Sequence, residues 1–160
     1  MKDSKLLSRQ KEQLYTICII ICCVMILPIV TYVDDIVVSD PGDAGPGTLR
    51  QAIIDAVDGD SIIFDMISST ISPTSGEYLI TKSITIDGFK YNDTLQIDGS
   101  QDVGRNSRIF RIASGKTVTI KNIKFIDTGE LARTSLFGGA ILSSGTLSIQ
   151  DCIFPSVMRT

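Results

Sequence analysis

Short segments in which apolar and polar residues alternate recur along most of this chain. Residues 138–154 repeat the pattern of residues 109–125 at a spacing of 29 positions, and residues 78–88 form a looser copy. Self-similarity at about 20–50 residues indicates units that bury a core only when they are stacked. Because the copies hold short strands and glycine corners, with no helical pattern between them, we predict an all-β parallel β-helix of a few coils.

Period-two alternation, or a short apolar run bounded by turn residues, predicts a series of short strands. Within the repeat, Ile149 corresponds to Ile120 and Phe154 to Phe125. The phase of the alternation changes at Asn122, which predicts a bend there, since Asn tolerates the backbone angles of a bend. The expected strands are residues 36–38, 61–64, 78–80, 83–87, 94–98, 108–112, 117–120, 123–126, 140–142 and 146–149.

The segment before these strands has a different, helical period. Thr48 and Gln51 have the spacing of a capping box, and Gly59 is a plausible end, so a helix is predicted over residues 48–58. A helix this short needs a surface to pack on. We expect it to cover the open end of the solenoid, because unpaired strand edges need a cover. Its apolar face consists of Leu49, Ala52, Ile53, Ala56 and Val57.

The first part of the chain has the pattern of an export segment. Residues 15–33 contain no charged residue and follow a mainly basic flank, which is typical of a signal peptide or a signal anchor helix. We therefore divide the chain into an export or anchor segment (residues 1–33), an N-terminal cap (34–60) and the coils (61–160). The expected location is the cell surface, the outer membrane or the extracellular space, with membrane attachment if the segment is retained.

The amino-acid composition limits the kinds of site that the chain can form. Three of the four cysteines lie in the export segment, so the exported part keeps Cys152 alone and is not a disulfide scaffold. That part has 11 basic and 16 acidic residues, which argues against nucleic-acid binding. The chain contains no histidine, which removes the commonest general base and any His-ligated metal.

The acidic residues are better explained by turns than by catalysis or metal binding. A polysaccharide-cleaving enzyme needs carboxylates that flank the bond, and the candidates here are Asp87, Asp98, Asp102 and Asp127. Asp87 and Asp98 each precede glycine at a strand end, as in turns. A second set of aspartates could suggest calcium binding, but it lacks the spacing of known calcium loops. This set consists of Asp40, Asp43, Asp58 and Asp60. No catalytic, metal or cofactor site is therefore expected.

Two segments resemble a known family. Residues 38–64 resemble the opening of many secreted bacterial right-handed parallel β-helix proteins, and Gly-Gly-Ala-Ile at 138–141 is similar to the repeated tetrapeptide of the chlamydial polymorphic outer membrane proteins. The resemblance implies a right-handed, exported, surface-exposed solenoid of the adhesin or autotransporter-passenger type. The chain departs from that family in having a single Gly-Gly-Ala-Ile, no Phe-x-x-Asn motif and no segments for a membrane barrel.

From these observations we expect a non-catalytic, adhesin-like or structural module that is a fragment of a longer outer-membrane or secreted protein. The ending favours a fragment, since the residues after Phe154 are too few for a terminal cap. The alternative is a fragment of a pectate lyase-like, polysaccharide-active enzyme.

A run of basic residues is the candidate binding site. No acidic residue interrupts the run between Asp102 and Asp127, and on a β-helix such residues can line one face. We expect it to bind anionic glycans of a host or an envelope, or surface proteins; the alternative is a solvated face that discourages edge pairing. The run consists of Arg105, Arg108, Arg111, Lys116, Lys121 and Lys124.

Overall fold

The computed structural model describes residues 12–13, 33–90, 93–101, 108–126 and 139–154. The chain divides into two compact units, Met1–Thr31 and Tyr32–Thr160, and the fold described below belongs to the second. The predicted export segment at residues 1–33 lies almost entirely outside the described residues. Among the residues that are described, no helix is both long and apolar enough to cross a bilayer.

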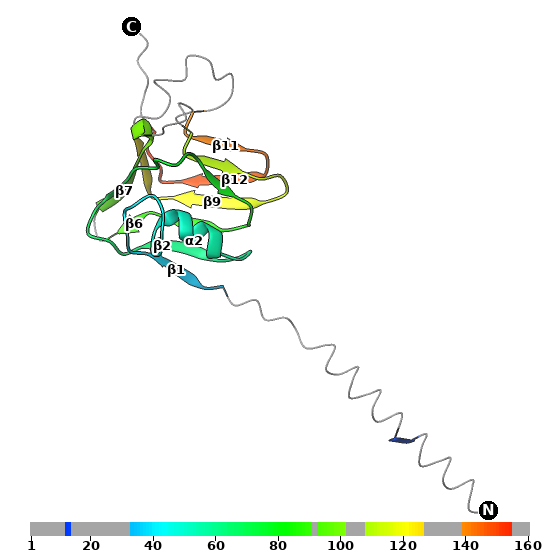
Figure 1. The fold of residues 1–160 in the computed structure, drawn as a ribbon. Coiled ribbons are helices and arrows are strands. Elements are labelled where there is room, and N and C mark those ends of the chain that lie inside the picture. Colours follow the sequence, from blue (N-terminus) through cyan, green and yellow to red (C-terminus); the bar gives the residue numbers. More distant parts are fainter. Residues whose placement is uncertain (1–11, 14–32, 91–92, 102–107, 127–138, 155–160) are drawn as a thin grey trace, which may run out of the picture. The chain divides into compact units, whose positions relative to one another are not determined.

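Three parallel sheets form the second unit, and the chain visits them in rotation (Figure 1). This path is a parallel β-solenoid of about three turns, as the repeats predict. Sheet A contains β1 (Asp35–Val38), β2 (Ser61–Phe64), β5 (Thr85–Asp87), β9 (Thr117–Lys121) and β12 (Thr146–Gln150). Sheet B contains β3 (Thr70–Ile71), β7 (Asp93–Asp98) and β10 (Ile123–Ile126); sheet C contains β4 (Tyr78–Ile80), β8 (Phe110–Ile112) and β11 (Ile141–Ser143).

The predicted strands are confirmed, with small shifts at several ends. β2, β4 and β10 have the predicted bounds. Two short strands were missed: β3, and β6 (Phe89–Lys90), which pairs antiparallel with β7. A 3-10 turn, Gly99–Gln101, was also missed. Each missed element is only two or three residues long, so alternation gives no signal for it.

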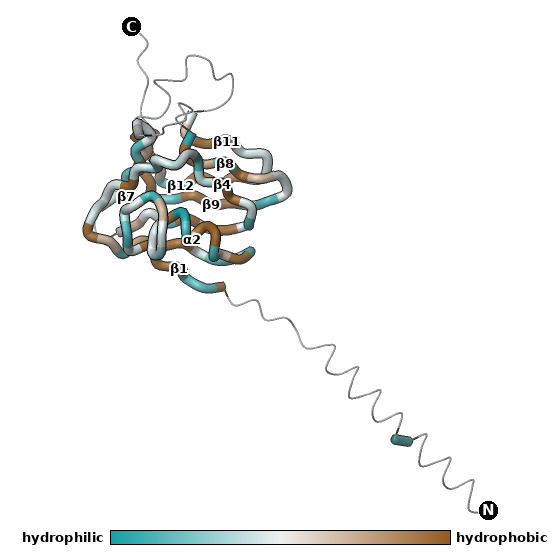
Figure 2. Tube along the Cα trace, in the orientation of Figure 1, coloured by the Kyte–Doolittle hydropathy of each residue, from teal (hydrophilic) through white to brown (hydrophobic). Residues whose placement is uncertain are grey.

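The core consists of apolar residues stacked from coil to coil, and Figure 2 shows apolar stretches recurring along the coils. On sheet A, Ile120 pairs with Ile149, so the spacing of 29 is confirmed there. Ile86, in the looser copy, pairs with Ile120. The rings of Phe125 and Phe154 are stacked with centroids 4.8 Å apart, which extends the same spacing to the corner beyond Asn122. That distance equals the ordinary separation of neighbouring strands.

On sheet C the repeat has a different register. Phe110 pairs with Ile141 rather than with the residue 29 positions later, so the alignment of residues 109–112 with 138–141 was wrong by two positions. The connection from β11 to β12 is shorter than that from β8 to β9. Gly145 allows the short connection, since a Cβ atom there would lie 2.8 Å from the carbonyl oxygen of Ala113 and closer still to that of Lys116.

The predicted bend at Asn122 is confirmed. Asn122 has φ 57°, and Asp151, its counterpart one coil later, has φ 49°. Asn is among the few residues that occupy this left-handed region readily. The Asn122 side-chain amide also donates a hydrogen bond to the Asp87 carboxylate (2.7 Å), which ties the corner to the preceding coil.

The helix before the coils, α2 (Leu49–Asp55), is shorter than predicted. The Thr48 hydroxyl accepts a hydrogen bond from the Gln51 N–H (3.3 Å), so the N-cap is confirmed. The Gln51 side chain bonds to Asp55 instead of closing the capping box. Ala56 is the C-cap, so the prediction that Gly59 ends the helix was wrong. α2 packs against β1 and β4, and its buried residues Leu49, Ala52 and Ile53 join the core.

Candidate functional site

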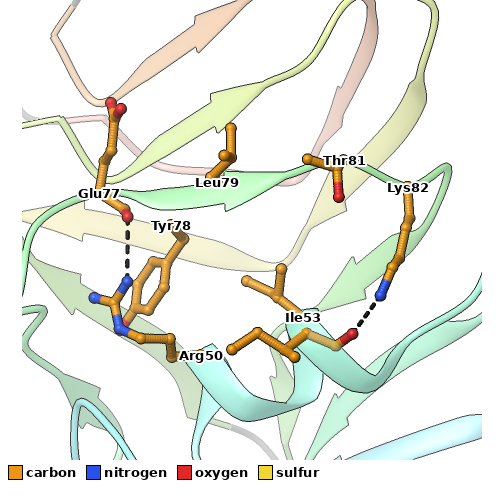
Figure 3. Close-up of a pocket in the computed structure, with 8 residues that line it drawn as sticks. Arg50, Ile53, Glu77, Tyr78, Leu79, Thr81 and Lys82 are labelled. Atoms are coloured by element: carbon orange, nitrogen blue, oxygen red, sulfur yellow. Dashed lines mark hydrogen bonds between the residues drawn. The ribbon is translucent and has the colours of Figure 1, made fainter.

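A groove of about 370 Å³ lies between α2 and β4 (Figure 3). It forms because sheet C ends at β4, where the neighbouring element is a helix instead of another strand. One wall comes from α2 and the other from β4 and its flanks. The residues that line the groove are Arg50, Ile53, Ile54, Glu77, Tyr78, Leu79, Thr81 and Lys82.

Arg50 closes one end of the groove and fastens α2 to the coil. Its guanidinium forms an ion pair with Asp43 (2.7 Å) and donates to the carbonyl oxygens of Gly76 (2.8 Å) and Glu77 (3.2 Å). It also lies over the Tyr78 ring, 4.5 Å from the centroid. Burial would raise the pKa of Asp43, but hydrogen bonds from Ser75 and the Arg50 charge lower it below its ordinary value. Asp43 is therefore a charged anchor for Arg50.

Lys82 stands at the other end of the groove. Its ammonium group donates to the carbonyl oxygen of Ile54, near the C-terminal end of α2 (Figure 3). Between Arg50 and Lys82 the walls are apolar and open to solvent: Ile54 is 59% exposed and Leu79 is 45% exposed. The groove thus combines apolar walls with a cation at each end.

Two of the predicted basic residues lie beside this groove. Arg108 and Arg111 both form ion pairs with Glu77, at 3.1 Å and 2.6 Å. One carboxylate therefore bridges two guanidinium groups at this corner. The Arg111 side chain is 47% exposed and so is accessible to a ligand.

The other predicted basic residues do not join them. Lys116 forms an ion pair with Asp58 (3.1 Å) at the corner between sheets C and A, and Lys121 forms one with Asp87 (3.1 Å) at the end of β9. Lys124 lies on β10 in sheet B. Arg105 lies outside the described residues. In the described part of the chain the run is thus divided among the three sheets, because the chain turns through all of them within one coil.

The acidic candidates are also separated. Asp87 lies on sheet A and Asp98 on sheet B, while Asp102 and Asp127 fall outside the described residues. Burial would raise the pKa of Asp87, but hydrogen bonds from Asn122, the Phe89 N–H and Lys121 lower it. Asp98 accepts a hydrogen bond from the Ser100 N–H (2.8 Å), as in a turn. The two carboxylates do not flank a common site.

The acidic side chains in the segment 34–60 mainly accept hydrogen bonds from backbone N–H groups and neighbouring side chains. Asp60 is buried and accepts hydrogen bonds from the N–H groups of Asp34 (3.2 Å) and Val57 (2.9 Å). The Ser83 N–H and then Lys116 lower the pKa of Asp58. Asp40 accepts a hydrogen bond from the Gly42 N–H (2.7 Å). No group of three potential metal-ligating side chains is found within the described ranges.

Sequence reasoning missed the groove because its walls are distant in the chain. Arg50 lies within the predicted helix, and Lys82 lies at a predicted corner of a coil. Neither position in the sequence indicates which residues the side chain contacts. The chain matches no family model, and no curated protein or solved structure is detectably similar to it.

Proposed function

We propose that this chain is an exported, surface-exposed, non-catalytic binding module of the adhesin type, and that the groove between α2 and β4 is its binding site. The groove itself carries the proposal: apolar walls at Ile54 and Leu79 lie between the cations Arg50 and Lys82. Such apolar walls supply area to bury, and a few convergent polar groups supply orientation. Residues 1–33 would direct export, as expected from their apolar run and basic flank.

The fold suits this role because a solenoid holds its surface groups at fixed spacing. Ligand-binding groups on strands are positioned more precisely than groups on loops. Leu79 lies on β4 between Glu77 and Thr81, which flank the strand, and Arg111 lies on the neighbouring strand β8. Arg111, whose side chain is 47% exposed, would offer a cation to acidic partners from solution. The resemblance to surface-exposed bacterial solenoids supports the same reading.

Attachment assays test this proposal. We would couple the full chain to beads and measure attachment to epithelial cells and to immobilised acidic glycans and proteins. Leu79→Glu places a negative charge on the groove wall, so attachment should fall at least tenfold. Ile67→Glu is the matched control, because Ile67 is fully exposed and does not line the groove.

Two results would refute the proposal. One is a wild-type chain that attaches to none of these surfaces. The other is an equal loss of attachment in Leu79→Glu and Ile67→Glu. Protease treatment of intact cells that produce the chain tests its exposure separately, since an exported chain is cleaved while a cytosolic marker survives.

A further inference from the structure

β12 leaves one edge of sheet A without a neighbouring strand among the described residues. The sheet runs from β1 to β12, and β12 pairs only with β9 (Figure 1). The Thr146 N–H donates to a carbonyl of the coil before (2.8 Å), and the Gln150 carbonyl accepts from an N–H of that coil (3.1 Å). Successive residues of a strand direct their peptide groups to opposite sides. The N–H and C=O groups of Leu147 and Ile149 therefore point away from β9, along the free edge.

The apolar layer of this coil is open on the same side. Ile149 is 45% exposed and Phe154 is 44% exposed, whereas their counterparts one coil earlier, Ile120 and Phe125, are fully buried. Both side chains thus occupy core positions that lack a layer above them. Burial of such apolar area drives association. A strand that pairs with β12 and directs apolar side chains inward would cover the edge and the core together.

The pattern of β12 matches that requirement. Its sequence Thr-Leu-Ser-Ile-Gln alternates polar and apolar residues symmetrically about Ser148 and contains no charge. Strand edges are usually protected by charged residues or proline, and β12 has neither. At the opposite edge of the sheet, β1 begins with Asp35 and follows Asp34. β12 offers no cation to those carboxylates, so a second β12 suits this edge better than β1 does.

We propose that β12 pairs antiparallel with β12 of a second copy of this chain, so that two solenoids join end to end. The two-fold axis passes between the two Ser148 residues, and each copy contributes the same patch. Leu147 of each copy pairs with Ile149 of the other, and their free peptide groups bond to one another. Parallel sheets often carry an antiparallel strand at an edge. Paired side chains stay on one face, so the two cores meet; dilution restores the exposed Ile149 of the single copy.

Charge does not oppose this pairing. Asp151 is the one charged residue in the described range 139–154, and it would lie opposite Gly145 of the second copy. At about 3.3 Å per residue, the two Asp151 residues are then roughly 20 Å apart. Since the Debye length is about 8 Å at physiological ionic strength, their repulsion is screened. β12 does not line the groove between α2 and β4, so this inference is independent of the proposed function.

Disulfide cross-linking of the full chain tests the geometry. Detergent micelles are kept in large excess over protein, so that two chains share a micelle only if they associate. The four native cysteines are replaced by alanine. Ser148→Cys then places two thiols at opposed positions with Cα atoms about 4.5 Å apart, where a disulfide can form. The matched control is Thr119→Cys, because Thr119 pairs with Ser148 one coil earlier and would lie about 14 Å from its counterpart. Dimers of Ser148→Cys should form at least tenfold faster.

A charge at the same position tests whether this edge holds the dimer together. Ser148→Lys sets two ammonium groups against each other at the axis, and like charges directly opposite destabilise a strand pair. Thr119→Lys adds the same charge to the same face of sheet A, one coil away. By light scattering, the wild-type chain should be a dimer, which Ser148→Lys weakens at least tenfold and Thr119→Lys leaves intact. If Ser148→Lys fails to fold by circular dichroism, the cross-linking rates decide.

Four outcomes would overturn the inference. A monomeric wild-type chain would show that no second copy covers β12. Equal cross-linking of Ser148→Cys and Thr119→Cys would exclude the two-fold pairing. A dimer unchanged in folded Ser148→Lys would place the contact elsewhere in the chain. Oligomers larger than a dimer would identify β1 of the next copy as the occupant, in a head-to-tail array. Bead attachment tests the groove separately, so the proposed function stands or fails by that assay.

Discussion

Replacing Gly88 by alanine tests how closely the coils approach one another. Gly88 follows β5 at the corner between sheets A and B. A Cβ atom at this position would lie 2.7 Å from the Ile123 side chain and 3.0 Å from Leu95 Cβ, and closer still to the Asn122 carbonyl oxygen. Real Cβ contacts of this length are essentially absent, so the backbone of the next coil must move. Overpacking of this kind costs about 1–3 kcal/mol and sometimes more.

The matched control is Gly139→Ala. No atom lies within 4 Å of a Cβ built at Gly139, and its backbone is not left-handed, so alanine there should be neutral or stabilise by up to about 1 kcal/mol. For a domain of this size, Gly88→Ala should lower Tm by roughly 5–15 °C. Circular dichroism melts of the three chains measure both effects. An unchanged Tm in Gly88→Ala, or an equal fall in Gly139→Ala, would refute the close approach of the coils.

Three further predictions concern the cap, the core and the corner. Thr48→Ala removes the N-cap acceptor of α2 and should cost about 1 kcal/mol in urea unfolding; no change would show that the cap does not stabilise α2. Ile120→Ala, at a fully buried position, should cost about 2–5 kcal/mol, whereas Ile149→Ala, at a position 45% exposed one coil later, should cost less than half as much; equal costs would contradict the described end of the core. Burial raises the pKa of Asp87, but its hydrogen bonds hold that pKa below the ordinary 3.8. Its contribution to stability is therefore complete above the unfolded pKa and is lost as pH falls through the lower folded value. The stability difference between wild type and Asp87→Asn should be full at neutral pH and shrink in acid, and a difference that grows in acid would contradict this sign.

The candidate site was only partly predictable. Arg108 and Arg111 were expected to bind an anionic ligand, and they lie next to each other around Glu77. Lys116 and Lys121 are paired with acids on other corners. A run of like charges in sequence indicates one surface only if the chain does not turn, and here it turns through three sheets within the run.

By itself, the sequence determined the strands other than β3 and β6, the bend at Asn122 and the stacking of Ile120 on Ile149. Alternation and turn preference are local properties, so a single segment carries the signal. Only the tertiary structure decided the register of sheet C and the groove between α2 and β4. Both depend on the lengths of connections and on the packing of segments distant in the chain. The groove exists because a helix, and not another strand, is the neighbour of β4.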